Sequence, residues 1–258
     1  MRVVIGVVYQ SIFYNVLDIY NYNKSGKLDG YFNYIKKQHD RIEGDICEIG
    51  VYKGHSLIST ALMLKDIGSD KKVWGFDSFS GFPFYHANDD LSKFEELHAN
   101  GVISDEHIYD FRLNIEFKEF LSGKSASPSN ISSSLDFSET SLSLLKRKIE
   151  YFGLDNIVLV DGDYKETMTK KAHKNIKFMA ALLDCDLYEG HKIALPFVWE
   201  RLENGGYIYL DEYYSLKFPG ARIATDEFFL DKTDKPEMYP IRQMDFERWF
   251  VRKNIETT

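Results

Sequence analysis

The stretch DICEIGVYKGHSLISTALMLKDIG, residues 45–68, combines the signals of a strand, a tight turn and a helix. Residues 45–50 form a mainly apolar run that ends at Gly50, as expected for a buried strand. Residues 55–68 carry apolar side chains at helical spacing and close on Gly68. We therefore expect a strand, a glycine-containing turn and a helix in direct succession.

Four further segments have the apolar character of buried strands, and each ends in an acid or a glycine. They are residues 72–77, 156–162, 178–184 and 206–212. Because helical patterns alternate with these segments, the chain predicts an α/β fold with a parallel sheet covered on both faces. Two late segments, 236–244 and 247–253, are expected to form a hairpin of strands. Ligands of such sheets bind at the carboxyl ends of the strands.

The turn after the first strand has the pattern E-x-G-x-x-x-G, formed by Glu48, Gly50 and Gly54. Glycines allow close approach of the backbone, and the following helix offers free N–H groups. The pattern does not match the G-x-G-x-x-G of dinucleotide sites, which favours a nucleoside ligand without a pyrophosphate. In such sites the turn approaches the amino-acid end of S-adenosylmethionine (SAM). An ordinary tight turn is the alternative.

The second strand ends in Asp77, 23 residues beyond Gly54, where an acid can accept hydrogen bonds from two ribose hydroxyls. Capping of a helix is the alternative role of Asp77. The third strand ends in an acidic turn that is a candidate wall of the adenine pocket or a plain loop. Further residues predicted to bind the cofactor lie in the turns and at the strand ends. They are Val51, Tyr52, Ser56, Ser78, Phe79, Asp161, Gly162, Asp163 and Asp184.

The stretch LLDCDLYEG, residues 182–190, ends an apolar run with two carboxylates, and the fifth strand ends in Asp211 and Glu212. Neighbouring strand ends lie a few ångströms apart, so Asp184 is expected to meet this acidic pair. Three carboxylates that converge without a basic partner favour a hard divalent cation such as Mg²⁺. Carboxylates satisfied by capping, backbone N–H groups and water are the alternative.

The composition restricts the partners of the chain. The net charge is −8 and the isoelectric point about 5.4, so neither nucleic acid nor an anionic membrane is expected as the main partner. Cys47 and Cys185 both lie in apolar runs, which excludes a disulfide framework and favours a reducing cytoplasm. The apolar run at residues 3–9 is too short to span a bilayer and predicts a peripheral strand or the edge of a subunit contact.

We expect residues 1–258 to form one domain with two additions. Residues 1–40 form an N-terminal extension, and residues 84–135 interrupt the strand and helix alternation with a segment rich in charge, Ser and Asn. Its position directly after the second strand predicts a substrate lid, part helix and part mobile loop. A helix follows, with Asp136 or Ser138 as its expected cap.

Four runs together resemble the macrocin and mycinamicin O-methyltransferase family (TylF-like). They are GDICEIGVYKGHS, VWGFDSFSGFP, LLDCDLYEG and LENGGYIYLDEYYSLKFPGARIATDEF, within residues 28–230. The resemblance implies a class I SAM methyltransferase fold, Rossmann-like, with seven strands, a bound Mg²⁺ and methyl transfer to a sugar hydroxyl. It also suggests a homo-oligomer.

The family's site residues carry over by position. Glu48, Gly50 and Gly54 resemble the SAM glycine motif, Asp77 and Ser78 the ribose-binding corner, and Asp184, Asp211 and Glu212 the metal ligands. Relatives usually have two aspartates at the last pair, and a Ser or Thr where this chain has Gly190 after Glu189. The segment 84–135 is longer than usual. These departures concern the acceptor more than the reaction.

Methyl transfer from a sulfonium to oxygen needs a nucleophilic oxygen held in line with the methyl carbon. A divalent cation that chelates adjacent hydroxyls would fix them and lower the pKa of the reacting one. Asp186 and Asp184 are the candidate bases, with His191 behind them. Two other functions remain open: a nucleotide-sugar oxidoreductase or epimerase, which should carry a dinucleotide motif, and a degenerate SAM-fold binding protein, which should lack the acids.

Overall fold

The computed structural model describes residues 13–171, 173–241 and 245–254. The apolar run at residues 3–9, predicted as a strand or subunit contact, therefore lies outside the described residues. The elements in chain order are α2 (Asp29–Gln38), β1 (Asp45–Ile49), α3 (His55–Asp66), β2 (Val73–Asp77), η1 (Ala87–Asp89), α4 (Lys93–Ala99), α5 (Asp105–Ser122), α6 (Leu142–Phe152), β3 (Ile157–Asp161), α7 (Tyr164–Thr167), β4 (Phe178–Leu183), α8 (Tyr188–Arg201), β5 (Leu202–Leu210), η2 (Asp211–Tyr213), α9 (Pro219–Phe229), β6 (Glu237–Met238) and β7 (Trp249–Arg252).

The sheet has seven strands in the order β3-β2-β1-β4-β5-β7-β6. The five strands from β3 to β5 are parallel, whereas β7 runs antiparallel to β5 and β6 antiparallel to β7. The mostly parallel sheet and the antiparallel C-terminal pair confirm the predicted fold class. The chain order reverses direction at β1, which lies between β2 and β4, so the ends of these three strands form the crevice where open α/β sheets bind ligands.

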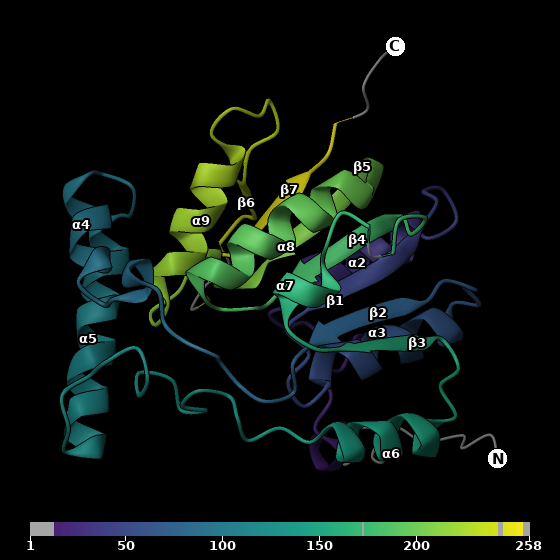
Figure 1. The fold of residues 1–258 in the computed structure, drawn as a ribbon, viewed down its shortest axis with the longest axis horizontal. Coiled ribbons are helices and arrows are strands. Elements are labelled where there is room, and N and C mark those ends of the chain that lie inside the picture. Colours follow the sequence, from purple (N-terminus) through teal and green to yellow (C-terminus); the bar gives the residue numbers. More distant parts are fainter. Residues whose placement is uncertain (1–12, 172, 242–244, 255–258) are drawn as a thin grey trace.

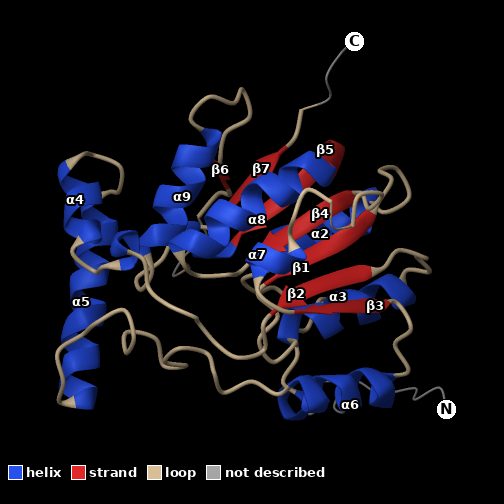
Figure 2. Cartoon of the chain, in the orientation of Figure 1, coloured by secondary structure: helices blue, strands red, loops and turns tan. Residues whose placement is uncertain are grey.

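Helices cover both faces of the sheet (Figures 1 and 2), and a hydrophobic core lies on each face. Ile46 of β1 packs in the core formed with α2 and α3, while Cys47 and Ile49 pack in the core formed with α8 and α9. This alternation follows from the two-residue repeat of a strand. Both faces are covered, which explains why the strands are nearly continuous in apolar residues.

The strands end slightly earlier than the sequence pattern suggests. β4 ends at Leu183 and β5 at Leu210, so Asp184 and Asp211 are the first residues beyond each strand. A side chain just beyond a strand is no longer committed to one face of the sheet. The acids therefore project at the carboxyl edge rather than into either core.

The predicted cap of α6 was wrong. Ser141, not Asp136 or Ser138, accepts a hydrogen bond from the N–H of Leu144 with its side chain. Asp136 instead accepts from the N–H and hydroxyl of Ser138 in a local turn, so its carboxylate is engaged before the helix begins. The helix starts three residues later than a cap at Ser138 would place it.

The segment 84–135 contains η1, α4 and α5 and has its own small core. Phe94, Ile108 and Phe111 form its centre, with Leu216 from the loop before α9 packed against them. The Ser-rich stretch that follows is anchored by Ile131, which is fully buried beside Phe218. In Figure 1, α4 and α5 lie at one side of the molecule, away from the sheet. Closure of this segment over a ligand stays a prediction.

Within the described ranges, no helix is long and apolar enough to cross a bilayer. The segment that precedes β1 packs on the sheet instead: Tyr31 and Ile35 of α2 are fully buried, and the hydroxyl of Tyr34 donates to the carbonyl of Gly205. The N-terminal extension is thus part of the folded body from residue 13 onward.

Candidate active site

A cavity of about 560 Å³ opens at the carboxyl edge of the parallel strands. Its volume lies within the usual range for pockets that enclose a small molecule. Residues that follow β3, β2, β1, β4 and β5 all line it, together with residues of the N-terminal segment and of the loop after β2. Convergence of the acid-tipped strands on one crevice is therefore observed.

Asp77 ties the turn after β1 to the end of β2. Its Oδ2 accepts from the N–H groups of Val51 and Tyr52, each at 2.8 Å, and its Oδ1 accepts from the N–H of Phe79 at 2.7 Å. A carboxylate has about four acceptor positions, so this arrangement leaves room for one more donor from the cavity. Asp77 thus holds the turn in shape as well as lining the pocket.

Gly50 lies against the end of β4. Its φ is +88°, and a Cβ atom at this position would stand 1.9 Å from the carbonyl oxygen of Asp184. The glycine is therefore required by the approach of two strand ends, where the sequence pattern suggested approach to a ligand. The turn and the acidic segment are held together by backbone contact.

Glu48 is fully buried behind the turn and does not line the cavity. Its Oε1 accepts from the hydroxyl of Ser56 at 2.8 Å, whereas its Oε2 has no hydrogen-bond partner. Burial raises the pKa of Glu48 to about 8, against the opposing effect of the Ser56 hydrogen bond. The carboxyl is accordingly protonated at neutral pH.

The raised pKa of Glu48 makes stability depend on pH. The folded state holds the proton more tightly than the unfolded chain, so the contribution is complete below pH 4.5 and is lost as the pH rises through about 8. The side chain of the Glu48→Gln variant remains neutral at all pH values. Its free energy of unfolding should therefore rise, relative to that of the unmodified protein, by about 2 kcal/mol when the pH is raised from 6 to 8.5. Urea unfolding at both pH values measures this difference. Glu43→Gln, at an exposed site, is the control, and an equal response of both variants would refute the assignment.

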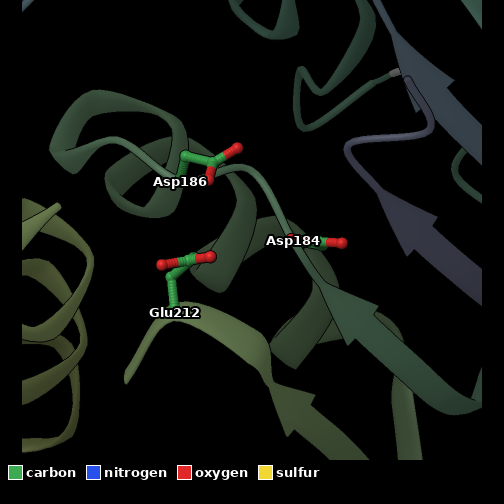
Figure 3. Close-up of side chains that lie close together, drawn as sticks. All are labelled: Asp184, Asp186 and Glu212. Carbon is green, nitrogen blue, oxygen red and sulfur yellow. The ribbon is translucent and has the colours of Figure 1, made fainter. Parts of the chain in front are cut away.

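Three carboxylates meet at the ends of β4 and β5. Asp184, Asp186 and Glu212 each offer an oxygen, and the three oxygens lie within 4.8 Å of one another. Figure 3 shows the side chains of Asp184 and Asp186 on the segment after β4 and that of Glu212 on the segment after β5. Asp186 has φ +58°, a left-handed conformation that turns the chain immediately before α8.

Asp211 lies beside this trio but is bound by a lysine. Its Oδ2 accepts from Nζ of Lys27 at 2.9 Å. Burial alone would raise the pKa of Asp211, but Lys27 outweighs it and holds the pKa below its usual value. Burial lowers the pKa of Lys27, but the carboxylates of Asp211 and Asp184 raise it by more. The net change in this pKa is therefore an increase. The lysine is therefore a fixed positive charge.

The charge balance of the cluster fits a divalent cation. Burial, and then neighbouring acids, raise the pKa values of Asp184 and Asp186 well above the usual range. With Asp211 and Glu212 the cluster contains four carboxylates, and Lys27 and Lys217 supply two positive charges. If all are ionised, two negative charges remain. Buried oxygens in this number and proximity are the ligands that Mg²⁺ or Ca²⁺ prefers.

Most predicted site residues line the cavity. These are Gly50, Val51, Tyr52, Ser56, Asp77, Ser78, Gly162, Asp163, Asp184, Asp186, Asp211 and Glu212. The structure places Glu48, Gly54, Phe79, Asp161 and His191 outside the lining.

His191 is the predicted catalytic residue that the structure does not bring to the cavity. It is 1% exposed, and its Nδ1 lies 3.1 Å from the carbonyl oxygen of Leu187. Burial lowers its pKa to about 4. A neutral, enclosed imidazole of this kind packs α8 against the preceding turn.

Sequence reasoning missed two lysines and an aromatic wall. Lys27 and Tyr20 reach the cavity from the N-terminal segment, and Nζ of Lys217 lies 3.6 Å from Oε1 of Glu212. Phe82 and Phe84 add apolar surface from the loop after β2. Lys217 follows the last acidic pair by five residues, which is a usable signal. No pattern in the sequence marks Lys27.

Comparison with known proteins places this chain in a family. The model of the family described as Macrocin-O-methyltransferase (TylF) matches residues 27–123 and 124–253. A mycinamicin III 3''-O-methyltransferase from Micromonospora griseorubida is 26% identical over 193 residues, which cover 73% of this chain and 61% of the relative. An 8-demethyl-8-(2,3-dimethoxy-alpha-L-rhamnosyl)-tetracenomycin-C 4'-O-methyltransferase from Streptomyces olivaceus is 27% identical over 177 residues, which cover 67% and 54%. The chain thus spans less than two thirds of the length of these relatives.

A solved structure agrees in fold. The calicheamicin methyltransferase CalS11 superposes with a TM-score of 0.59 at 19% identity, covering 95% of this chain and 79% of that one. The family match extends over almost the whole described chain and includes every strand of the sheet. The chain therefore belongs to the TylF macrocin-O-methyltransferase family.

Proposed function

We propose that this protein transfers the methyl group of SAM to a hydroxyl of a sugar or glycoconjugate, with a divalent cation, Mg²⁺, in the acidic cluster. The observation that supports this proposal is that the glycine turn, Asp77 and the carboxylate cluster all line one cavity. A methyl donor bound at the turn and a hydroxyl bound at the cluster would therefore share one enclosed space.

The order of the strands supports the placement of the donor. The ends of β3, β2, β1 and β4 follow one another along the sheet and present Gly162, Asp77, Gly50 and Asp184 in that order. Three strand spacings span about 14 Å. We assign the adenine to the β3 end, the ribose to Asp77 and the amino-acid part to the Gly50 turn. On this assignment, the methyl group would face Asp184.

The cation would be held by Asp184 and Glu212, which belong both to the set predicted from the sequence and to the observed trio. When bound, it would supply Lewis-acid activation of the acceptor hydroxyl. Asp186 lines the cavity, and no described residue engages its carboxylate in a hydrogen bond. We assign to it the acceptance of the hydroxyl proton. Lys27 and Lys217 limit the excess negative charge before ligands bind.

The acceptor assignment rests on the relatives. The names of the two similar enzymes describe O-methylation on mycinamicin and on a rhamnosyl-bearing tetracenomycin. Phe82, Phe84 and Phe137 add apolar surface to the lining of the cavity, which suits the apolar face of a sugar ring. We also propose a homo-oligomeric assembly.

Donor binding is tested by thermal unfolding. SAM at about 100 times its dissociation constant should stabilise the protein by about 2.7 kcal/mol, or roughly 5–10 °C in melting temperature. S-adenosylhomocysteine should act similarly, and ATP, which shares only the nucleoside, is the control. Absence of any shift with both SAM and S-adenosylhomocysteine would contradict the donor assignment.

The reaction is tested by transfer of labelled methyl groups to a panel of sugar nucleotides and glycosides, with Mg²⁺ or with EDTA. Cation-dependent labelling of a sugar is the expected outcome. Labelling that persists in EDTA would remove the cation from the proposal. Donor binding with no transfer to any acceptor would favour a SAM-fold binding protein.

A further inference from the structure

Helix α5 has two apolar faces, of which the protein itself covers one. Ile108 and Phe111 on the covered face are buried, with Ile115 packed beside them. His107 on the same side is also buried, and its Nε2 lies 2.8 Å from the carbonyl oxygen of Ser215. This face accounts for the attachment of α5 to the rest of the molecule.

The other face is open to solvent. Tyr109, Phe117, Phe120 and Leu121 are 61%, 57%, 85% and 78% exposed. With the partly buried Leu113, they recur at intervals of four, four, three and one residues, which places them along one side of a helix. We call these five residues the α5 stripe. A solvated helix would carry polar side chains here.

The α5 stripe is large for a monomer surface. Aromatic side chains offer about 150–250 Å² each, so three aromatics and Leu121 at these exposures present on the order of 400–500 Å². That equals the largest apolar patches found on ordinary monomers, which are often interaction sites. The described ends of the chain do not reach it: Phe13 packs on Phe152 of α6, and β7 leads to the other end, both remote from α5 in Figure 1.

The charges beside the stripe identify the occupant. Arg112 and Glu116 flank the same edge of the stripe, one turn apart, and both are exposed. If two α5 helices pack antiparallel about a two-fold axis near residue 115, Tyr109 lies opposite Leu121, and Leu113 opposite Phe117. Arg112 of each copy then lies about 3 Å along the axis from Glu116 of the other. In this arrangement the exposed charges at this edge of the stripe are complementary between the two copies.

A lipid surface fits these charges poorly. Helices that bind anionic membranes carry Lys and Arg along the polar face. The exposed residues beside the stripe are instead mostly acidic, with Asp105, Glu106, Glu116 and Glu119 against Arg112. Arg112 is also held in place by Glu95, with contacts of 2.9 and 2.6 Å, so its position is fixed before association.

We propose that the α5 stripe is a dimer interface that pairs two copies of this chain through antiparallel α5 helices. Two stripes together provide about 800–1,000 Å² of apolar surface, to which the flanking polar residues add, so the contact reaches the lower range of specific interfaces. We expect weak, reversible association in the micromolar range, as is usual for contacts at the small end of the size range. The inference is independent of the enzymatic activity.

Sedimentation equilibrium from about 1 to about 200 μM tests the interface. The unmodified protein should associate reversibly to a dimer, and Phe117→Lys/Phe120→Lys should weaken the association by at least about 30-fold. Leu230→Lys is the matched control, because Leu230 is 73% exposed at the end of α9, outside the stripe. Far-ultraviolet circular dichroism checks that each variant is folded.

A charge exchange tests the orientation of the helices. Arg112→Glu and Glu116→Arg should each weaken the dimer, because like charges would face each other, and the double variant should restore it. A monomer at all concentrations, or an oligomer that keeps its affinity in the Phe117→Lys/Phe120→Lys variant, would overturn the proposal. So would equal weakening by Leu230→Lys, or flotation of the protein with phosphatidylcholine vesicles in place of dimerisation.

Discussion

Replacement of Asp184 by Asn should reduce methyl transfer by about 10³-fold, comparable to the loss of a principal electrostatic group in an active site. The same change should raise the melting temperature without added cation. Asp184 is partly buried and lies beside Asp186, Asp211 and Glu212, and these like charges disfavour the folded state until a cation binds. Initial rates at several Mg²⁺ concentrations and thermal unfolding in EDTA measure the two effects.

A loss of activity together with a gain in stability is expected if Asp184 belongs to a cation site. A residue that only supports the fold would lose stability when it is replaced. Glu203→Gln is the control, because Glu203 lies on β5 at the end remote from the cluster and pairs loosely with Lys177 at 3.9 Å. It should leave both quantities nearly unchanged. Binding of Mn²⁺, followed by electron paramagnetic resonance, should be lost in Asp184→Asn. A variant that is less stable and still binds Mn²⁺ would show that Asp184 serves the fold.

Replacement of Gly50 by Ala should cost more than about 4 kcal/mol in free energy of unfolding, or about 8 °C or more in melting temperature. The added Cβ would stand 1.9 Å from the carbonyl oxygen of Asp184, so β1 and β4 would have to separate at their ends. The pairing of Ile49 with Leu183 adjoins this point. Donor binding should also fall, because the turn and the acidic cluster would no longer be aligned.

Gly68→Ala isolates the contribution of the backbone angle. Gly68 has φ +69°, and a Cβ added there would meet no atom within 4 Å, so only the left-handed conformation penalises alanine. That penalty is about 1–2 kcal/mol. Chemical unfolding of both variants gives the comparison. If Gly50→Ala is no worse than Gly68→Ala, the contact between β1 and β4 is not the reason for the glycine.

The order of elements follows from local signals. The five parallel strands were recognisable because burial on both faces demands nearly continuous apolar residues, and the helix after Gly54 because its apolar residues repeat at helical spacing. Asp77 and Gly162 could be placed at the cavity because parallel strands bring their carboxyl ends to one edge. These inferences need only the periodicity of the chain.

The partners of the acids did not follow from local signals. Lys27 and Asp211 are 184 residues apart, and their contact depends on how the N-terminal segment crosses the sheet. His191 was expected near the cluster because it follows Asp186 by five residues, but α8 turns it into the core. Sequence proximity is a poor guide at a point where the chain changes from strand to helix.

By itself the sequence determined the α/β fold, the row of strand ends that lines the cavity and the identity of its acids, because each depends on residue type and spacing along a strand or helix. The tertiary structure decided which acids are paired with lysines, which glycine is required by the contact between two strand ends, and which face of α5 is left open. These depend on contacts between distant segments, and such contacts are set by packing in three dimensions.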